Sequence, residues 1–243
     1  MYRSLNADLI VDTCRSTQHR IALKFPDSGL SHIAGEISAV SNEAAMLSKW
    51  LARAHLPLRI LAGIAIVTMF VMIISIGRHI HVEMKVESIS AFLEGLDAGI
   101  NEIVFICVAA YFFLTLETRL KRRRSLKALR ELRSLAHVID MHQLSKDPER
   151  MADTTSEPGQ EPKRPLKPAE LIRYLDHCSD LLALISKLAA LYVQHLDDPV
   201  TLAAVNEIEN LTTGLSQKIW QKIMILDRIL SPGQPQGVPD RLG

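Results

Sequence analysis

Apolar residues along this chain occur both as continuous runs and as helically spaced stripes. The run from Ile60 to Gly77 contains no charged residue. As a helix it would extend about 27 Å, close to the hydrocarbon thickness of a bilayer. Arg59 and Arg78 bracket this run, and their long side chains can reach the two interfaces. We therefore predict a transmembrane helix over residues 58–77.

A second apolar run, from Ile103 to Leu116, is shorter and by itself has the length of a buried core helix. The residues from Ala98 to Glu102 extend it to a spanning length and place Glu102 near the outer interface. Its aromatic residues suit contact with lipid, and a dense basic cluster follows it directly. We predict a second transmembrane helix over residues 99–117.

The charges around the two runs indicate a topology. The loop between the runs carries two cations, Arg78 and Lys85, and four carboxylates. Eight cations follow the second run: Arg119, Lys121, Arg122, Arg123, Arg124, Lys127, Arg130 and Arg133. The positive-inside rule then places the loop outside and both termini in the cytoplasm, with a bacterial inner membrane as the default. Apolar residues at helical spacing in 78–98 also predict an interfacial helix on the outer leaflet.

The remaining stripes predict cytoplasmic helices. Residues 1–57 form two stripes separated by a turn from Phe25 to Gly29, which indicates an N-terminal helical hairpin. No break follows the second span until Lys146, so we expect a basic helical stalk over 118–147. Residues 148–168 are rich in proline and predict a linker, and 231–243 predict a disordered tail.

The clearest periodicity lies in the predicted C-terminal helical hairpin, residues 169–230. A second row of leucines widens its first stripe, so this helix requires more than one packing partner. Asp198 and Pro199 are suited to cap and begin the second helix. The first stripe follows alternating steps of four and three, as in a coiled-coil seam: Leu171, Leu175, Cys178, Leu182, Ile185, Ala189, Tyr192 and Leu196.

These patterns together predict an all-α protein, an integral membrane hairpin of two transmembrane helices with a cytoplasmic helical bundle. The cytoplasmic helices carry more apolar surface than one partner helix covers, which favours a homo-oligomer or a cytoplasmic protein partner. The net charge of +1 gives no support for nucleic-acid binding. Three widely separated cysteines argue against a disulfide framework. The chain has no glycine-rich phosphate loop, paired-cysteine zinc pattern or nucleophile elbow, so we predict no catalytic residue and no cofactor.

One polar cluster stands out, formed by His137, Asp140 and His142, with His177 on the C-terminal hairpin as a further member. His137 and Asp140 share a helix face, whereas His142 lies about 140° from His137 around a straight helix. The two imidazoles therefore do not easily hold one metal ion. Hydrogen bonding between helices or solvation is the simpler interpretation, and a metal site is the alternative.

The basic cluster supports two interpretations as well. Arg119, Lys121, Arg122, Arg123, Arg124 and Lys127 can bind anionic lipid headgroups, or they can serve only to fix the topology. Glu102 is a carboxylate near membrane depth, which points to ion or proton handling in an oligomeric channel or transporter. A solvated carboxylate at the interface is the simpler interpretation of Glu102.

Three runs of the sequence resemble an uncharacterised family of bacterial two-span inner-membrane proteins. They are SLNADLIVDTCRSTQHRIALKFPDSG, LKALRELRSLAHVIDMHQLSKDPER and AALYVQHLDDPVTLAAVNEIENLTTGLSQKIWQKIMIL. The resemblance implies two spans and a bacterial inner membrane. That family has no assigned activity, so no functional residue is carried over, and the resemblance directs attention to Ala136–Pro148 and Trp220.

The leading functional hypothesis is a non-enzymatic membrane protein whose cytoplasmic bundle mediates interaction or assembly. The alternatives are a metal-dependent, membrane-anchored enzyme or sensor built around His137, Asp140 and His142, and a subunit of an oligomeric channel or transporter.

Overall fold

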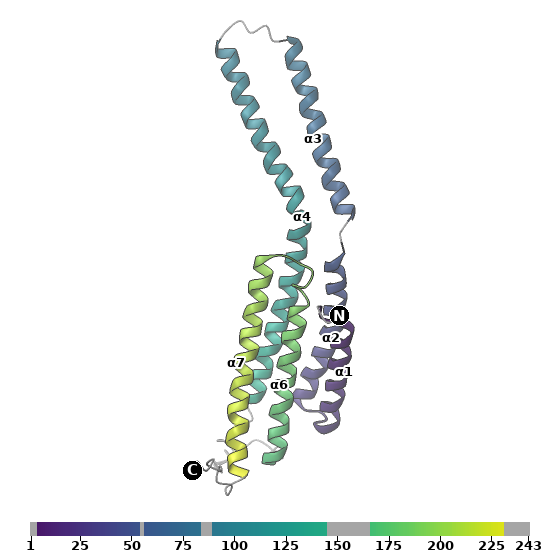
Figure 1. The fold of residues 1–243 in the computed structure, drawn as a ribbon, viewed down its shortest axis with the longest axis vertical. Helices are drawn as coiled ribbons and strands as arrows, with labels where there is room; N and C mark the ends of the chain where they lie inside the picture. The colour runs from purple at the N-terminus through teal and green to yellow at the C-terminus, as the bar shows by residue number, and fades with distance from the viewer. Residues whose placement is uncertain (1–3, 54–55, 84–88, 145–165, 231–243) are drawn as a thin grey trace, which may run out of the picture. The chain divides into compact units, whose positions relative to one another are not determined.

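The computed structural model describes residues 4–53, 56–83, 89–144 and 166–230. Within these ranges all regular secondary structure is helical, which confirms the predicted all-α fold. In chain order the helices are α1 (Ala7–Lys24), α2 (Gly29–Ala52), α3 (Leu56–Glu83), α4 (Ile89–Leu144), α6 (Pro168–Ala190) and α7 (Pro199–Leu230) (Figure 1). The chain divides into two compact units, one of Met1–Leu51 with Ser125–Gly243 and the other of Ala52–Arg124.

The first unit is a helical bundle. Helices α1, α2, α6 and α7 and the C-terminal part of α4 lie side by side and share one hydrophobic core (Figure 1). Each helix contributes apolar residues at steps of three and four, because only that spacing keeps side chains on one helix face. On α4 the fully buried residues are Leu132, Ala136 and Ile139, so the predicted stalk is part of this core.

Helix α6 is buried on more than one side and packs against both α1 and α7. Every residue of its predicted seam is buried, from Leu171 to Leu196. The second row is buried too: Leu181, Leu184, Leu188 and Leu191. The surplus apolar surface is therefore covered inside a single chain, and it no longer argues for a homo-oligomer.

Local sequence signals determine where the helices of the bundle begin and end. The Oδ2 atom of Asp198 accepts hydrogen bonds from the Thr201 amide (2.9 Å) and hydroxyl (2.7 Å), as expected for the cap of α7. Asp27 adopts a left-handed φ of 55° in the turn between α1 and α2. Helix α6 ends at Ala190, before the last two seam residues. Tyr192 and Leu196 remain buried in the connection to α7, because burial of a side chain does not require a helical backbone there.

The second unit contains α3 and the first part of α4, which run in opposite directions (Figure 1). Many of their large apolar side chains are exposed: Phe70 of α3 is 56% exposed and Phe105 of α4 is 76% exposed. Among the described residues, one helical stretch is long and apolar enough to cross a membrane. It lies within Gly99–Leu144 of α4, and none of its apolar window is buried in the protein. The apolar stretch described for α3, Arg59–Ser75, is shorter.

The segment predicted as an outer loop with an interfacial helix is divided between two long helices. Residues up to Glu83 belong to α3, and α4 already begins at Ile89. Helix α4 begins at Ile89 and runs through the glycines at positions 95 and 99. Glycine lowers helix propensity, but it keeps its backbone N–H and therefore does not interrupt the helical hydrogen bonds. Residues 84–88, most of the predicted linker and the predicted C-terminal tail lie outside the described residues.

Candidate functional site

The predicted histidine cluster is not assembled as a metal site. Among the described residues, no three His, Cys, Asp or Glu side chains are placed to hold one metal ion. His137 is exposed on α4, whereas the His142 imidazole lies against the backbone of Gly29 at the start of α2. Asp140 accepts a hydrogen bond from the Gln143 amide on its own helix. The four candidates therefore have separate local environments.

His177 is the least expected of the four, because it is 5% exposed and neither ring nitrogen makes a hydrogen bond to another described group. Its Nδ1 atom lies 3.5 Å from Oδ2 of Asp180, one turn along α6. The ring also meets the edge of Phe25, with centroids 6.3 Å apart, and Phe25 packs edge-on against Tyr174 at 5.5 Å. This arrangement makes His177 a packing residue between the α1–α2 turn and α6.

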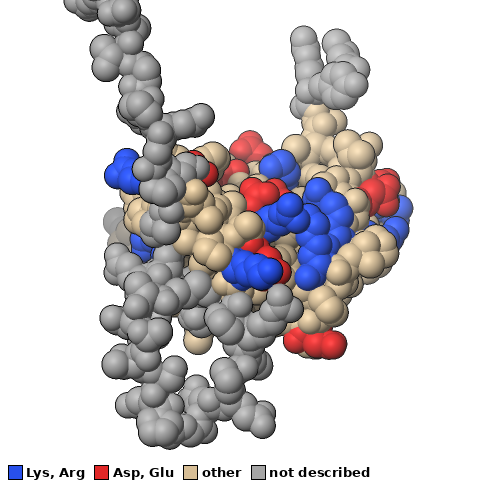
Figure 2. All heavy atoms as spheres, turned by 90° about the horizontal axis from the view of Figure 1, so that it is seen from below, with Lys and Arg blue, Asp and Glu red and all other residues tan. Residues whose placement is uncertain are grey.

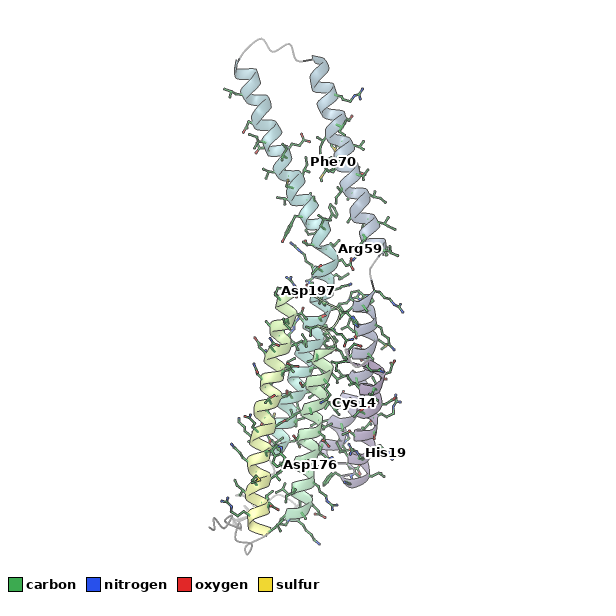
Figure 3. The ribbon with its side chains drawn as sticks, viewed as in Figure 1. Cys14, His19, Arg59, Phe70, Asp176 and Asp197 are labelled. Atoms are coloured by element: carbon green, nitrogen blue, oxygen red, sulfur yellow. The ribbon has the colours of Figure 1, made fainter. Side chains whose placement is uncertain are left out.

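The best-connected polar group lies in the second unit, where α3 and α4 are joined by an ion network. Oε2 of Glu117 lies 2.8 Å from Nε of Arg59, and its Oε1 lies 3.0 Å from Nζ of Lys121. The Lys121 ammonium also donates to the carbonyl oxygen of Arg53 at 3.0 Å. The side chains of Glu117 and Lys121 are only 14% and 11% exposed, so both partners are largely removed from water. This network holds the start of α3, where Arg59 is labelled in Figure 3, against α4.

Sequence reasoning assigned Lys121 to lipid headgroups and did not identify Glu117. The i, i+4 spacing of Glu117 and Lys121 was a usable signal, because such pairs face each other on a helix. The position of Arg59 beside Glu117 was not accessible from the sequence, since it depends on how α3 and α4 pack. The rest of the basic cluster differs in exposure: Arg119, Arg123, Arg124 and Lys127 are exposed, and Arg122 is half-buried.

Arg119 has a specific environment within this cluster. Its guanidinium carbon lies 5.5 Å from the centroid of the Phe112 ring and 5.9 Å from that of Tyr111. Both distances are within the range of a cation–π interaction. Because helical side chains tilt towards the N-terminus, Arg119 reaches back towards the apolar stretch that precedes it.

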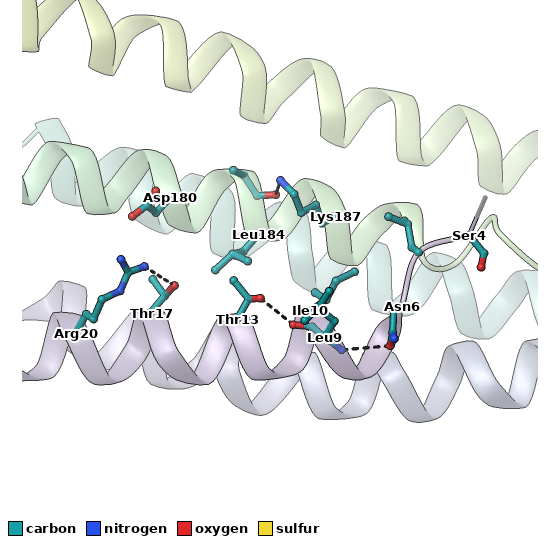
Figure 4. Close-up of a pocket in the computed structure, with 12 residues that line it drawn as sticks. Ser4, Asn6, Leu9, Ile10, Thr13, Thr17, Arg20, Asp180, Leu184 and Lys187 are labelled. Atoms are coloured by element: carbon teal, nitrogen blue, oxygen red, sulfur yellow. Dashed lines mark hydrogen bonds between the residues drawn. The ribbon is translucent and has the colours of Figure 1, made fainter. Parts of the chain in front are cut away.

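The bundle carries a groove between α1 and α6, shown in Figure 4, with a volume of about 910 Å³. Its floor is made of the nearly buried residues Ile10, Thr17 and Leu184. Leu9, 65% exposed, stands on the α1 side. At one end the Leu5 amide donates to Oε1 of Gln194 at 2.9 Å, which ties the N-terminal segment to the α6–α7 connection.

Both signs of charge line this groove. Arg20 of α1 donates to the Thr17 hydroxyl at 3.1 Å, while Asp180 and Lys187 project from α6 (Figure 4). An apolar floor with charged sides suits a short amphipathic segment, because its apolar face can be buried while its polar residues pair at the rim.

Basic and acidic side chains are interspersed on the end of the molecule seen in Figure 2. Elsewhere in the bundle, Arg133 of α4 pairs with Glu207 of α7. On the face shown in Figure 2 the described charges form no large field of a single sign, so the surface offers no broad attraction to a polyanion.

Two cysteines of the bundle are buried thiols without a nucleophilic environment. Burial raises the pKa of Cys178 to about 12. Burial also raises the pKa of Cys14, and a hydrogen bond with Ser41 opposes part of that shift. Neutral thiols are poor nucleophiles, so neither residue suits covalent catalysis. Cys14 points into the bundle and His19 points away from it (Figure 3).

Comparison of the chain with protein-family models, with curated proteins and with solved structures finds no match. The family resemblance inferred from the three sequence runs therefore stays a prediction.

Proposed function

We propose that this protein is a membrane-anchored helical bundle that mediates interaction or assembly at the cytoplasmic face of a bacterial inner membrane. The observation that carries the proposal is the change in burial along α4. Its apolar window is not buried in the protein, whereas Leu132, Ala136 and Ile139 of the same helix are fully buried. Exposed apolar surface of that extent needs a nonaqueous environment, and lipid provides it.

In this proposal α3 is the first span and the N-terminal part of α4 the second. Arg59 and Arg78 mark the ends of the α3 run, and both are exposed where their side chains can reach the interfaces. The basic residues that follow the α4 run retain the residues 1–53 and 125–243 on the cytoplasmic side. Pairing of Glu117 with Arg59 and Lys121 stabilises the hairpin at that end.

Membrane anchoring is tested by extraction. We expect the full chain to stay in the membrane pellet after alkaline carbonate treatment. Replacing Val104 and Val108 by arginine places two charges in the exposed apolar face of α4, at about 2.5–3.5 kcal/mol each. This double variant should move to the soluble or aggregated fraction, whereas Leu9→Arg on the exposed side of α1 should not. A wild-type chain that is fully soluble would contradict the proposal.

Topology is tested by labelling introduced cysteines with a maleimide that does not cross membranes. We expect Arg78→Cys to react in intact spheroplasts, and Leu9→Cys to react only after the membrane is opened. The natural Cys14 and Cys178 are buried and give little background, and the exposed Cys107 is replaced by alanine in every variant. The opposite pattern of labelling would invert the proposed orientation.

For the interaction role, the groove between α1 and α6 is the surface with the most suitable chemistry, and an amphipathic helix of a partner protein is the expected occupant. A photoreactive residue at Leu9 should crosslink such a partner in cells. Ala183→Trp narrows the groove and should abolish this crosslink, whereas Ala203→Trp on exposed α7 should leave it unchanged. Equal crosslinking in both variants would exclude the groove as the docking surface.

A further inference from the structure

The basic cluster of α4 is divided into two faces with different roles. Glu117 and Lys121 lie on the side of α4 that meets α3, where the Glu117 carboxylate pairs with both Arg59 and Lys121. Arg119 and Arg123 are one turn apart and lie about 200° around the helix from Glu117 and Lys121, respectively. Between Tyr111 and Arg130 the sequence has one carboxylate, Glu117, and it is engaged on the first face.

Arg119 is held in place on this second face without a carboxylate partner among the described residues. Its contacts there are the rings of Tyr111 and Phe112, which are 63% and 46% exposed on the apolar stretch of α4. Cation–π contact fixes the plane of a guanidinium group but leaves its N–H donors at the edge available. These donors are therefore positioned at the boundary between apolar and basic residues.

We infer that Arg119 and Arg123 bind the phosphate of an anionic phospholipid. This inference rests on the proposed membrane anchoring, because only then is α4 surrounded by lipid at Tyr111 and Phe112. At the end of a span the phosphate group is the anion that lipid supplies, and the planar fork of arginine binds phosphate through two parallel hydrogen bonds. The rings of Tyr111 and Phe112 would lie beside the acyl chains of the same lipid, as aromatic residues do at membrane interfaces.

A purely topological role for the cluster makes a different prediction. The positive-inside rule counts lysine and arginine alike, and so does general attraction to an anionic surface. A phosphate site built on a stacked guanidinium requires arginine, since lysine lacks both the fork and the stacking plane. Conservative substitution to lysine therefore separates the two roles while charge and topology are kept.

The test uses the full chain in nanodiscs of phosphatidylcholine doped with phosphatidylglycerol. Native mass spectrometry after release measures how much phosphatidylglycerol is retained per chain relative to phosphatidylcholine. We expect the Arg119→Lys/Arg123→Lys protein to show about fivefold lower selective retention, the equivalent of about one exposed cation–π interaction, because lysine keeps the charge but loses the stacked guanidinium plane. Arg130→Lys is the matched control, because Arg130 is an exposed arginine further along α4 that donates to the Leu126 carbonyl.

Unchanged retention in the double lysine variant would overturn the inference, and so would an equal loss in the Arg130→Lys protein. Displacement of the lipid by millimolar inorganic phosphate would assign the site to a soluble anion and would overturn it as well. Carbonate extraction of each variant is measured in parallel. A double variant that stays in the membrane but loses selective retention supports the lipid site, whereas a wild-type chain absent from the membrane rejects the proposed function itself.

Discussion

The imidazole of His142, near the end of α4, lies so close to the Cα atom of Gly29 that a methyl group there would come 2.1 Å from Cε1. Gly29 is the first residue of α2, directly after the turn that Ser28 closes through a hydrogen bond from its hydroxyl to the Phe25 carbonyl. A side chain at position 29 is therefore disfavoured by the close approach of His142 from α4, and not by the backbone conformation of Gly29.

Gly29→Ala should consequently destabilise the bundle by about 1–2 kcal/mol, because His142 is an end-of-helix side chain that can move at moderate cost. In a His142→Ala background the same substitution should be neutral or stabilising by up to about 1 kcal/mol, since alanine favours the helix. Thermal unfolding of the four proteins of this cycle in detergent measures the coupling. Equal effects of Gly29→Ala in both backgrounds would show that His142 is not the obstructing group.

Leu182→Ala tests the central position of α6. Leu182 is fully buried in the seam, and its truncation should lower the free energy of unfolding by about 2–5 kcal/mol. Leu9→Ala, at a position 65% exposed, should change it by about 0.5 kcal/mol or less. If the two substitutions had similar effects in monomeric protein, the seam would not be the core of a single chain.

Glu117→Gln should weaken the pairing of α3 with α4. It leaves the Lys121 ammonium, 11% exposed, without its carboxylate, so we expect a loss of about 2–4 kcal/mol. The double variant Glu117→Gln/Lys121→Gln should recover part of this loss, because the unpaired charge is removed too. Asp12→Asn is the control, since its ion pair with Arg15 is exposed and contributes little. Absence of recovery in the double variant would argue against the network.

The raised thiol pKa values predict loss of stability at alkaline pH. A cysteine thiol ordinarily has a pKa of 9.0, and burial raises the pKa of Cys178 in the folded protein to about 12. Its stabilising contribution is therefore complete below pH 9 and is lost as the pH rises towards 12. Over that window it lowers stability by up to about 1.4 kcal/mol per pH unit. Burial raises the pKa of Tyr174 and Tyr192 as well, which adds to the loss above pH 10.

Unfolding measured in detergent between pH 7 and 10.5 checks this expectation. Above pH 9, Cys178→Ala should reduce the slope of the unfolding free energy against pH by an amount equivalent to one proton. This holds whatever the effect of the substitution on stability at pH 7. An unchanged slope would mean that the thiol is not the group that titrates.

Much of the bundle could be predicted because the information is local. Steps of three and four identified the buried residues of α6, and the adjacent Asp198 and Pro199 marked the start of α7. The packing partners of those residues could not be predicted. The apolar residues of a helix show how much of its surface must be buried, but they do not show which other helix buries it. The surplus on α6 thus suggested a second copy, whereas α1 and α7 of the same chain pack against it.

The polar residues were harder to interpret for the same reason. His137, Asp140 and His142 are neighbours in sequence, yet His137 is exposed, Asp140 bonds Gln143 on its own helix, and His142 lies against Gly29 of α2. Glu117 gave one local signal, its spacing from Lys121, but its second partner Arg59 is 58 residues away. Ion pairs between residues so far apart in the chain depend on how the helices pack, and they produce no periodic pattern in the sequence.

The core of the bundle draws on the first 51 residues and on those after position 125, with α6 among the last helices to be synthesised. Because translation proceeds from the N-terminus, α1 and α2 emerge from the ribosome long before α6, against which α1 packs, has been made. Both apolar runs are also made in that interval. The bundle therefore closes only after the membrane segments have been translated, and until then the apolar faces of α1 and α2 must be shielded from aggregation by each other or by a chaperone.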